Sequence, residues 1–343
     1  MTPFFRNFSI IMLLWLILTA TVAAQPLNIL IYHHIADDTP HSTSTREAQF
    51  YAQLDHFEQQ GYQIVALDRA LEALQAGESL PAKSLALTFD DGFASVCDRV
   101  YPELKRRNLP FTVFVTTDPI DNNYPGYCSW AQLKAMAENG VTIANHTTDH
   151  AYLVRQALDD PQWLSQAQNN ITRAQQRIDD EIGYAPKLFA YPYGEYNLEL
   201  KQWLNAQGYI AFGQQSGSIG KHSDWQALPR FNASGHYAGI TSLRHKISAH
   251  PLAVDYAQLP DPLTRKRRPS MTLTLDPSSV AHYPHLQCYL NGTAIEVEWH
   301  SSHSLTVTPP DALSTGRHRV NCTAPHRQGS PYYWLSQQWL IVD

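Results

Sequence analysis

The sequence has few charged residues and no excess of positive charge. Charged residues make up only 16% of the chain, and 25 Lys and Arg against 31 Asp and Glu give a net charge of −6. A nucleic-acid binder usually carries a basic face, so this balance argues against DNA or RNA as a partner. Apolar residues make up 43% of the chain, which excludes a disordered or fibrous chain and leaves room for a sizeable core.

Long apolar runs are also missing, apart from one near the amino terminus. Residues 10–23 are almost purely apolar and follow Arg6. The small residues Val22 and Ala24 stand at positions −3 and −1 of a plausible cleavage site before Gln25. The run is shorter than the ~20 residues of a membrane-spanning helix. We therefore predict a secretory signal peptide over residues 1–24, with an uncleaved anchor as the alternative. The mature protein would be exported to the periplasm or the cell exterior and would not span a membrane.

Cysteine is scarce, and none of the four cysteines forms a CxxC pair, which argues against a zinc ribbon or a redox dithiol. An exported chain meets an oxidising compartment, where an even number of cysteines fits disulfides. Of three possible pairings, Cys97–Cys128 with Cys288–Cys322 is the simplest, because each bridge stays within one predicted domain. Such loops would stabilise the fold by roughly 3–4 kcal/mol. Four buried free thiols are the alternative.

Short apolar runs alternate with helical patterns from residue 27 to about residue 250. Strands are expected at 27–32, 62–67, 85–89, 111–116, 141–144, 188–191 and 210–212, and helices at 47–60, 67–75, 96–107, 130–139, 162–182 and 198–207. This alternation predicts an α/β domain over residues 25–258, a parallel sheet or barrel with helices outside. In such folds the chemistry lies where strands reach their carboxyl ends.

The pattern changes near residue 260. Residues 259–269 are rich in proline and basic residues and are predicted to be a solvated linker, although the run Arg265–Arg268 could also meet an anionic partner. Short alternating runs separated by turn residues then continue to the end of the chain. They predict a small all-β, Ig-like sandwich over residues 270–343, in which we find no catalytic constellation.

Three polar clusters fall at the carboxyl ends of predicted strands: Asp90-Asp91, the pair His146 and His150, and residues 192–194. Adjacent carboxylates repel unless a cation or a shared proton relieves them, although an Asp-Gly pair is also common in turns. Two imidazoles at i and i+4 can face one point, although a chain with 16 histidines can hold such a pair by chance. Together with Asp91 they make an oxygen and nitrogen ligand set that suits zinc, cobalt or nickel.

In this order the clusters resemble the polysaccharide deacetylases of carbohydrate esterase family four. The TFDDG at 88–92 and the HTxxH at 146–150 match the first two motifs of that family, and the PYG at 192–194 matches the third. The resemblance covers about residues 27–250. It implies a distorted (β/α) barrel and metal-dependent hydrolysis of N-acetyl groups from an N-acetylated polysaccharide or oligosaccharide.

The resemblance also implies roles for individual residues. Asp91, His146 and His150 would bind one divalent metal, with zinc as the first choice, and Asp90 would act as the general base. Tyr193 would offer its backbone N–H to the oxyanion.

Three further residues complete the expected substrate groove. The resemblance implies that Thr147 hydrogen-bonds nearby backbone. We also expect Thr147, Pro192 and Trp225 to line the groove together with Tyr193, although Trp225 matches no motif closely.

The sequence departs from the family at the residue that orients the base. The third motif usually carries an arginine where this chain has Ala190. Arg230, within Leu228-Pro229-Arg230-Phe231, could replace it from another strand, and an ordinary surface arginine is the alternative.

The general acid is the second departure. The late Leu243-Arg244-His245 has the letters of the fifth motif, but no apolar strand precedes it and the segment is typical of a helix. The early Ile31-Tyr32-His33-His34-Ile35 is similar to the opening of the branch that contains the poly-β-1,6-N-acetylglucosamine deacetylases of biofilm systems, in which an early histidine is the acid. We therefore favour His33, with a purely structural histidine pair as the alternative.

Three functions follow from these residues. The first is a secreted N-deacetylase acting on an N-acetylglucosamine polymer. The second is a weak or inactive carbohydrate-binding protein that keeps the metal site, and the third is an esterase that removes O-acetyl groups. The missing third-motif arginine favours the second weakly, and the intact carboxylate and histidine pairs oppose it.

Overall fold

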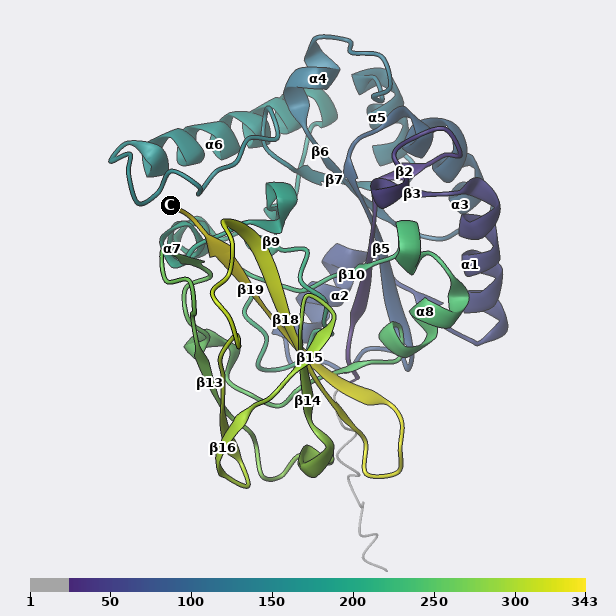
Figure 1. The fold of residues 1–343 in the computed structure, drawn as a ribbon. Helices are drawn as coiled ribbons and strands as arrows, with labels where there is room; N and C mark the ends of the chain where they lie inside the picture. Colours follow the sequence, from purple (N-terminus) through teal and green to yellow (C-terminus); the bar gives the residue numbers. More distant parts are fainter. Residues whose placement is uncertain (1–24) are drawn as a thin grey trace, which may run out of the picture.

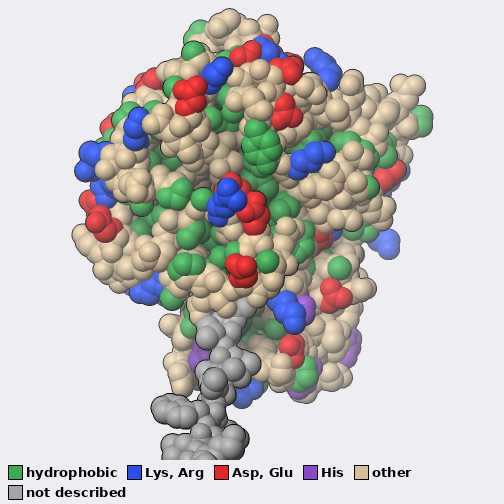
Figure 2. Space-filling view, turned by 180° about the vertical axis from the view of Figure 1, so that it is seen from behind, with side chains coloured by type: hydrophobic (Ala, Val, Ile, Leu, Met, Phe, Trp, Pro, Cys, Tyr) green, Lys and Arg blue, Asp and Glu red, His purple; other side chains and the backbone are tan. Residues whose placement is uncertain are grey.

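The computed structural model describes residues 25–343, so the predicted leader over residues 1–24 lies outside the described part. An α/β domain forms the upper part of Figure 1, and an all-β domain lies below it. Within the described residues, no helix has both the length and the apolar character needed to cross a bilayer. On the face seen in Figure 2, acidic and basic side chains are interspersed rather than gathered into one patch of one sign.

The α/β domain is built on an eight-stranded parallel sheet, as the alternating pattern predicts. Its strands follow the order β10 (Phe231–Asn232), β1 (Asn28–Tyr32), β5 (Ser84–Asp91), β6 (Thr112–Val115), β7 (Thr142–Asn145), β8 (Leu188–Ala190) and β9 (Ile210–Phe212), while β4 (Gln63–Ile64) pairs with β5 from off this path. Strands β1, β5 and β6 are almost wholly buried because the sheet is covered on both faces. A short parallel pair, β2 (His34–Ile35) and β3 (Ser44–Thr45), lies apart from this sheet.

Helices cover the outside of this sheet (Figure 1). They are α1 (Glu47–Gln59), α2 (Leu67–Gln75), α3 (Tyr101–Arg106), α4 (Thr117–Asp121), α5 (Trp130–Ala137), α6 (Trp163–Ile182), α7 (Leu198–Ala206) and α8 (Ile240–Lys246). Helix α1 buries Phe50, Leu54 and Phe57, whose helical spacing puts them on one face toward the sheet. Helix α6 ends at Gly183, whose φ of 92° gives the left-handed cap that such ends favour.

One irregular segment bridges the two edges of the sheet. Leu228 forms an isolated parallel bridge with Phe212 at the edge of β9, and three residues later Phe231 pairs with Leu30 of β1. Between these two contacts lies Arg230, which is fully buried. The segment therefore completes the distorted barrel and carries a cation into its interior.

The all-β domain consists of two sheets packed around a second core. One sheet holds β11 (His250–Pro251), β19 (Tyr332–Ile341), β18 (Gly316–Pro325), β14 (Gln287–Leu290), β15 (Thr293–Ile295) and β12 (Leu263–Thr264), and the other holds β13 (Met271–Thr274), β17 (Ser304–Val307) and β16 (Glu298–Ser301). Leu273 and Leu305 of the smaller sheet belong to the same buried cluster as Val320 and Leu335 of the larger one. This packing confirms the predicted all-β region.

Both predicted disulfides are present. Cys97 pairs with Cys128 in the α/β domain, and Cys288 pairs with Cys322 across the neighbouring strands β14 and β18. No free cysteine remains among the described residues. Each disulfide therefore crosslinks two segments of one domain, and neither disulfide links the two domains.

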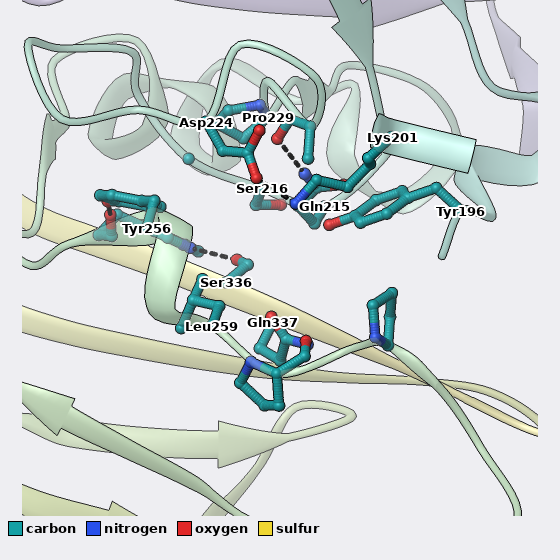
Figure 3. A pocket seen from close by; sticks show the side chains of 15 residues that line it. Tyr196, Lys201, Gln215, Ser216, Asp224, Pro229, Tyr256, Leu259, Ser336 and Gln337 are labelled. Atoms are coloured by element: carbon teal, nitrogen blue, oxygen red, sulfur yellow. Dashed lines mark hydrogen bonds and ion pairs between the residues drawn. The ribbon is translucent and has the colours of Figure 1, made fainter. Parts of the chain in front are cut away.

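The two domains share an interface built mainly on β19. Leu340 belongs to a buried cluster with Trp163 of α6 and Leu200 of α7, so the last strand packs directly on the barrel. A cavity of about 20 Å³, with room for about one water molecule, lies in this interface (Figure 3). Its wall on the barrel side includes the ion pair of Lys201 and Asp224. The cavity is too small to take a sugar ring.

The elements of the structure differ from the predicted ones in several places. The strand expected at 62–67 is only β4, and the helix expected at 96–107 opens with a π-helical turn over Val96–Val100 before α3. The predicted linker, residues 259–269, contains β12, because Leu263 and Thr264 pair with β19 instead of remaining solvated.

Candidate active site

Strand β5 delivers the two adjacent carboxylates. Strand alternation turns Thr88 and Asp90 to the barrel interior and Phe89 to the helix-covered side, where it joins the main hydrophobic cluster. Strict alternation would also send Asp91 outward. Its φ of 74°, followed by a φ of 79° at Gly92, breaks the extended conformation at this point. The turn therefore aims Asp91 back toward the same opening as Asp90.

The histidine pair follows strand β7. The His146 Nδ1–H donates to the carbonyl of Ala190 at 2.7 Å. In the neutral imidazole with this tautomer, the free lone pair is on Nε2. That Nε2 lies 3.2 Å from Asp91 Oδ1, and the Nε2 of His150 lies 3.4 Å from the same oxygen. Neither Asp91 Oδ1 nor His146 Nε2 has a hydrogen-bond partner, although both atoms are buried.

This arrangement fits a divalent cation. One ligand atom each from Asp91, His146 and His150 lies within 4.8 Å of the others. Buried polar atoms without partners are costly, so two of them converging on one point indicate a missing partner that accepts lone pairs. The Ala190 carbonyl fixes the His146 tautomer in the way that outer-shell partners orient metal ligands. One carboxylate and two imidazoles leave positions open for water and substrate.

The charge states of Asp91 and His150 agree with a bound cation. At His146, burial works to lower the pKa, but the carboxylates of Asp91 and Asp90 outweigh it and raise the pKa. Burial works to raise the pKa of Asp91, but the nearby imidazoles of His146, His33 and His150 outweigh it and hold that pKa well below the usual range. Burial, together with repulsion from His146, lowers the pKa of His150 to about 4. Asp91 is therefore an anion and His150 is neutral at pH 7, the states that metal ligation requires.

Asp90 and Arg230 form a fully buried ion pair. The two guanidinium nitrogens donate to the two carboxylate oxygens at 2.7 and 2.8 Å, and both side chains are 0% exposed. Arg230 also donates to Gly213 O at 3.0 Å and to Thr88 Oγ1 at 3.2 Å. Burial alone would raise the pKa of Asp90, but the charge of Arg230 outweighs it and lowers the pKa. Arg230 thus occupies the place beside Asp90 that the sequence leaves open at Ala190.

The third cluster forms a strained turn over Pro192–Gly194. Tyr193 has a φ of 58°, and a side chain on Gly194 would come within 2.6 Å of the backbone nitrogen of Gln214. The ring of Tyr193 packs against His150 at 4.4 Å and stacks on Tyr152 at 4.0 Å. The turn therefore lies against the histidine pair.

The all-β domain holds this turn from outside. Arg317 of β18 donates to the carbonyl of Tyr193 and pairs with Glu195 at 3.1 Å. Gln338 of β19 donates to the carbonyl of Gly194 at 2.7 Å. Glu195 is 1% exposed and also forms a two-point pair with Arg155. Sequence reasoning missed Arg317 and Gln338, because no spacing rule links positions more than 120 residues away from the turn.

Backbone strain is concentrated at the candidate site. Asp91, Thr147, His150 and Tyr193 all have positive φ values, between 57° and 74°. Thr147 is the most unusual of them because a β-branched side chain disfavours this conformation. Its hydroxyl accepts a hydrogen bond from the N–H of His150 at 3.0 Å, which stabilises the turn between the two histidines. Such strain is typical of functional sites, where the surroundings impose it.

The two candidate acids lie in different places. His33 follows β1, near enough to Asp90 and Asp91 to lower the pKa of both, and its buried Nδ1 has no partner. The neighbouring His34 stacks on Phe93 at 3.6 Å. His245 is exposed on helix α8, as its helical surroundings predict. The structure thus brings His33 to the cluster and leaves His245 outside it.

The remaining predicted groove residues are divided. Thr147 and Pro192 are buried parts of the two turns already described. Trp225 is partly buried against a separate hydrophobic cluster that includes Phe212 and Leu228. Among the described residues no contact joins Trp225 to the metal-ligand cluster, so core packing accounts for its position.

Comparison with known proteins agrees with the geometry. Residues 77–212 match the family model described as polysaccharide deacetylase. The YxkH protein of Bacillus subtilis (strain 168) is 27% identical over 214 residues, which cover 62% of this chain and 73% of that protein. The poly-beta-1,6-N-acetyl-D-glucosamine N-deacetylase of Escherichia coli (strain K12) is 23% identical over 242 residues, which cover 58% of this chain and 35% of that enzyme.

A solved structure supports the fold. IcaB from Ammonifex degensii superposes with a TM-score of 0.58 at 24% sequence identity, covering 66% of this chain and 98% of that one. At this sequence identity the match shows a shared fold and nothing about activity. The match covers only about a third of the length of the Escherichia coli enzyme.

Proposed function

Because this chain belongs to the polysaccharide deacetylase family, whose members are hydrolases that act on amide bonds, we propose that it is a metal-dependent N-deacetylase of an N-acetylglucosamine polymer. The observation that carries the proposal is the convergence of Asp91, His146 and His150 beside the buried Asp90. A ligand cluster without a base would suit a structural metal. A base next to the cluster suits hydrolysis.

A divalent cation held by Asp91, His146 and His150 would polarise the acetamide carbonyl and lower the pKa of the attacking water toward ~7. Zinc is the first choice for this ligand set, with cobalt or nickel as alternatives. The Asp90 carboxylate accepts the proton of the attacking water, and Arg230 keeps that carboxylate ionised and correctly oriented.

The other groups act on the oxyanion and the leaving amine. The backbone N–H of Tyr193 donates to the oxyanion, a contact of a kind whose loss typically costs about 2.7–4 kcal/mol. His33 gives a proton to the amine as the carbon–nitrogen bond breaks, which leaves acetate and a glucosamine unit. The unpartnered Nδ1 of His33 and the clamped turn at Tyr193 support these two assignments.

We also propose that the protein is exported. Two disulfides support this, because they persist in oxidising compartments. The predicted leader at residues 1–24 would direct the export.

A panel of substrates tests the proposed reaction. Acetate release would be measured on poly-β-1,6-N-acetylglucosamine, chitooligosaccharide, peptidoglycan and acetylxylan with zinc present. The proposal expects release from at least one of the three N-acetylated substrates and a much slower rate on acetylxylan. Faster release from acetylxylan would identify an O-acetyl esterase, and no release from any substrate would favour a non-enzymatic sugar-binding protein.

A further inference from the structure

A second, larger cleft lies between the barrel and the all-β domain. Its volume is about 640 Å³, and none of the residues that line it is acidic. Helix α8 and the end of β10 form one wall, with Asn232, Tyr237 and Lys246, and the other wall is the outer face of the β14–β18–β19 sheet. None of Asp90, Asp91, His146 or His150 lines it. The cleft is thus separate from the candidate active site, and sites for small ligands often lie between domains in this way.

The sheet wall is a polar and aromatic surface created by strand alternation. Arg319, Asn321 and Thr323 of β18 point to the cleft, whereas Val320 and Cys322 between them are fully buried in the sandwich core. Tyr289 lies opposite Asn321, and Trp334 lies opposite Thr323 in the strand register. The face therefore combines rings with amide and hydroxyl groups, a composition suited to the apolar faces and hydroxyls of sugars.

Two cations on the walls of this cleft have no acidic partner. Lys246 is only 8% exposed, and its ammonium donates to the Asn232 carbonyl at 3.3 Å and lies 4.1 Å from the ring centre of Tyr237. Arg319 is half-buried, and Tyr237 acts electrostatically on its guanidinium as well. Neither Lys246 nor Arg319 takes part in an ion pair with another of the described residues.

The surroundings make these charges costly. Burial lowers the pKa of Lys246 to about 8, and burial with repulsion from Arg317 lowers the pKa of Arg319. Buried charges are normally paired, and this chain has more acidic than basic residues with which to pair them. An anion supplied by a ligand would relieve both positions.

We propose that this cleft binds an anionic saccharide, a glycan with carboxylate-bearing sugar units. The carboxylate is held by Arg319 and Lys246, whose N–H groups form strong charge-assisted hydrogen bonds. The sugar rings lie against Tyr237 and Tyr332, which are 50% and 37% exposed. The rings and neutral polar groups around the cations favour a saccharide over a bare inorganic anion. The inference stands whether or not the chain is a deacetylase, because it uses none of the proposed catalytic residues.

The test is a comparison of ligands that differ in charge. A hyaluronan hexasaccharide, which alternates N-acetylglucosamine with glucuronate, and the same hexasaccharide with its carboxyl groups reduced to alcohols would be titrated into the full chain by isothermal calorimetry. The proposal expects the hyaluronan hexasaccharide to bind at least tenfold more tightly. Equal binding of the two, or binding of sodium sulfate as tight as that of the hexasaccharide, would overturn it.

Variants locate the binding. Arg319→Gln and, as a second variant that keeps the aliphatic stem, Lys246→Met should each raise the Kd for the hyaluronan hexasaccharide at least tenfold. Arg327→Gln, in the β18–β19 hairpin and outside the cleft, is the matched control and should leave the Kd unchanged. Unchanged binding in both cleft variants would also overturn the proposal. Acetate release from chitooligosaccharide, measured in parallel, should persist in all three variants, so failure of this inference and failure of the proposed enzymatic function give different results.

Discussion

The buried pair of Asp90 and Arg230 gives the sharpest quantitative prediction. Both side chains are 0% exposed, and two charge-assisted hydrogen bonds of 2.7 and 2.8 Å join them. Removing one partner of such a pair leaves an uncompensated buried charge, which typically costs about 3–5 kcal/mol. We therefore expect Arg230→Gln to lower the free energy of unfolding by about that amount. An exposed control, Arg69→Gln in the helical pair with Glu72, should change it by less than about 0.5 kcal/mol.

A double-mutant cycle separates the pair from general damage. Urea unfolding would be measured with EDTA present, so that metal binding does not shift the apparent stability. The combined Asp90→Asn and Arg230→Gln variant should lose less free energy of unfolding than the sum of the two single losses, by about 1–3 kcal/mol, because each single variant leaves a lone buried charge and the double variant leaves none. Strict additivity, or an Arg230→Gln loss as small as that of the exposed control, would refute the coupling.

The same pair predicts an effect on catalysis. Arg230→Lys keeps the charge but loses the planar two-point contact, so Asp90 would be held less precisely. A misplacement of about 1 Å can cost about 100-fold in rate. We expect kcat for acetate release to fall about 10- to 100-fold with little change in KM. A kcat at the wild-type level would contradict the positioning role of Arg230.

Three further predictions concern the metal, the domain contact and a disulfide. Dialysis against a chelator should abolish acetate release, and added zinc should restore it; activity that survives complete metal removal would contradict the ligand set. Arg317→Ala removes the hydrogen bond to the Tyr193 carbonyl. It should lower kcat at least severalfold with a Tm within a few degrees of wild type. An unchanged kcat would show that the turn keeps its conformation without Arg317. Replacing Cys97 and Cys128 by Ala opens a loop with a sequence separation of 31 residues. The free energy of unfolding, measured by urea titration, should fall by about 3–4 kcal/mol. A loss below about 1 kcal/mol would contradict the loop-entropy argument.

Local signals account for much of what the sequence predicted correctly. Strands β1, β5 and β6 come from apolar runs, and helices α1 and α2 from apolar residues at helical spacing. These patterns involve only residues near one another in the sequence, so the sequence alone predicts them. The clusters at Asp91 and at His146 to His150 were found for the same reason, because each is contiguous and follows a strand.

The rest depended on contacts between distant parts of the chain. Arg230 reaches Asp90 from 140 residues away, and whether it is buried or on the surface depends on how residues 228–232 span the edges of the barrel. The contacts of Gln338 and Arg317 with the 192–194 turn depend on docking of the second domain. Likewise, the pairing of Leu263 and Thr264 with β19 turned an expected linker into a strand, because an unpaired edge was available nearby.

The proposed function depends on one divalent cation held by Asp91, His146 and His150 beside a base. Zinc content by mass spectrometry, measured together with acetate release, tests it on the wild type, Asp90→Asn, and the double variant His146→Ala with His150→Ala. We predict one zinc per chain in the wild type, zinc without turnover in Asp90→Asn, and neither in the double variant. Full zinc occupancy in the double variant, or wild-type turnover in Asp90→Asn, would contradict it.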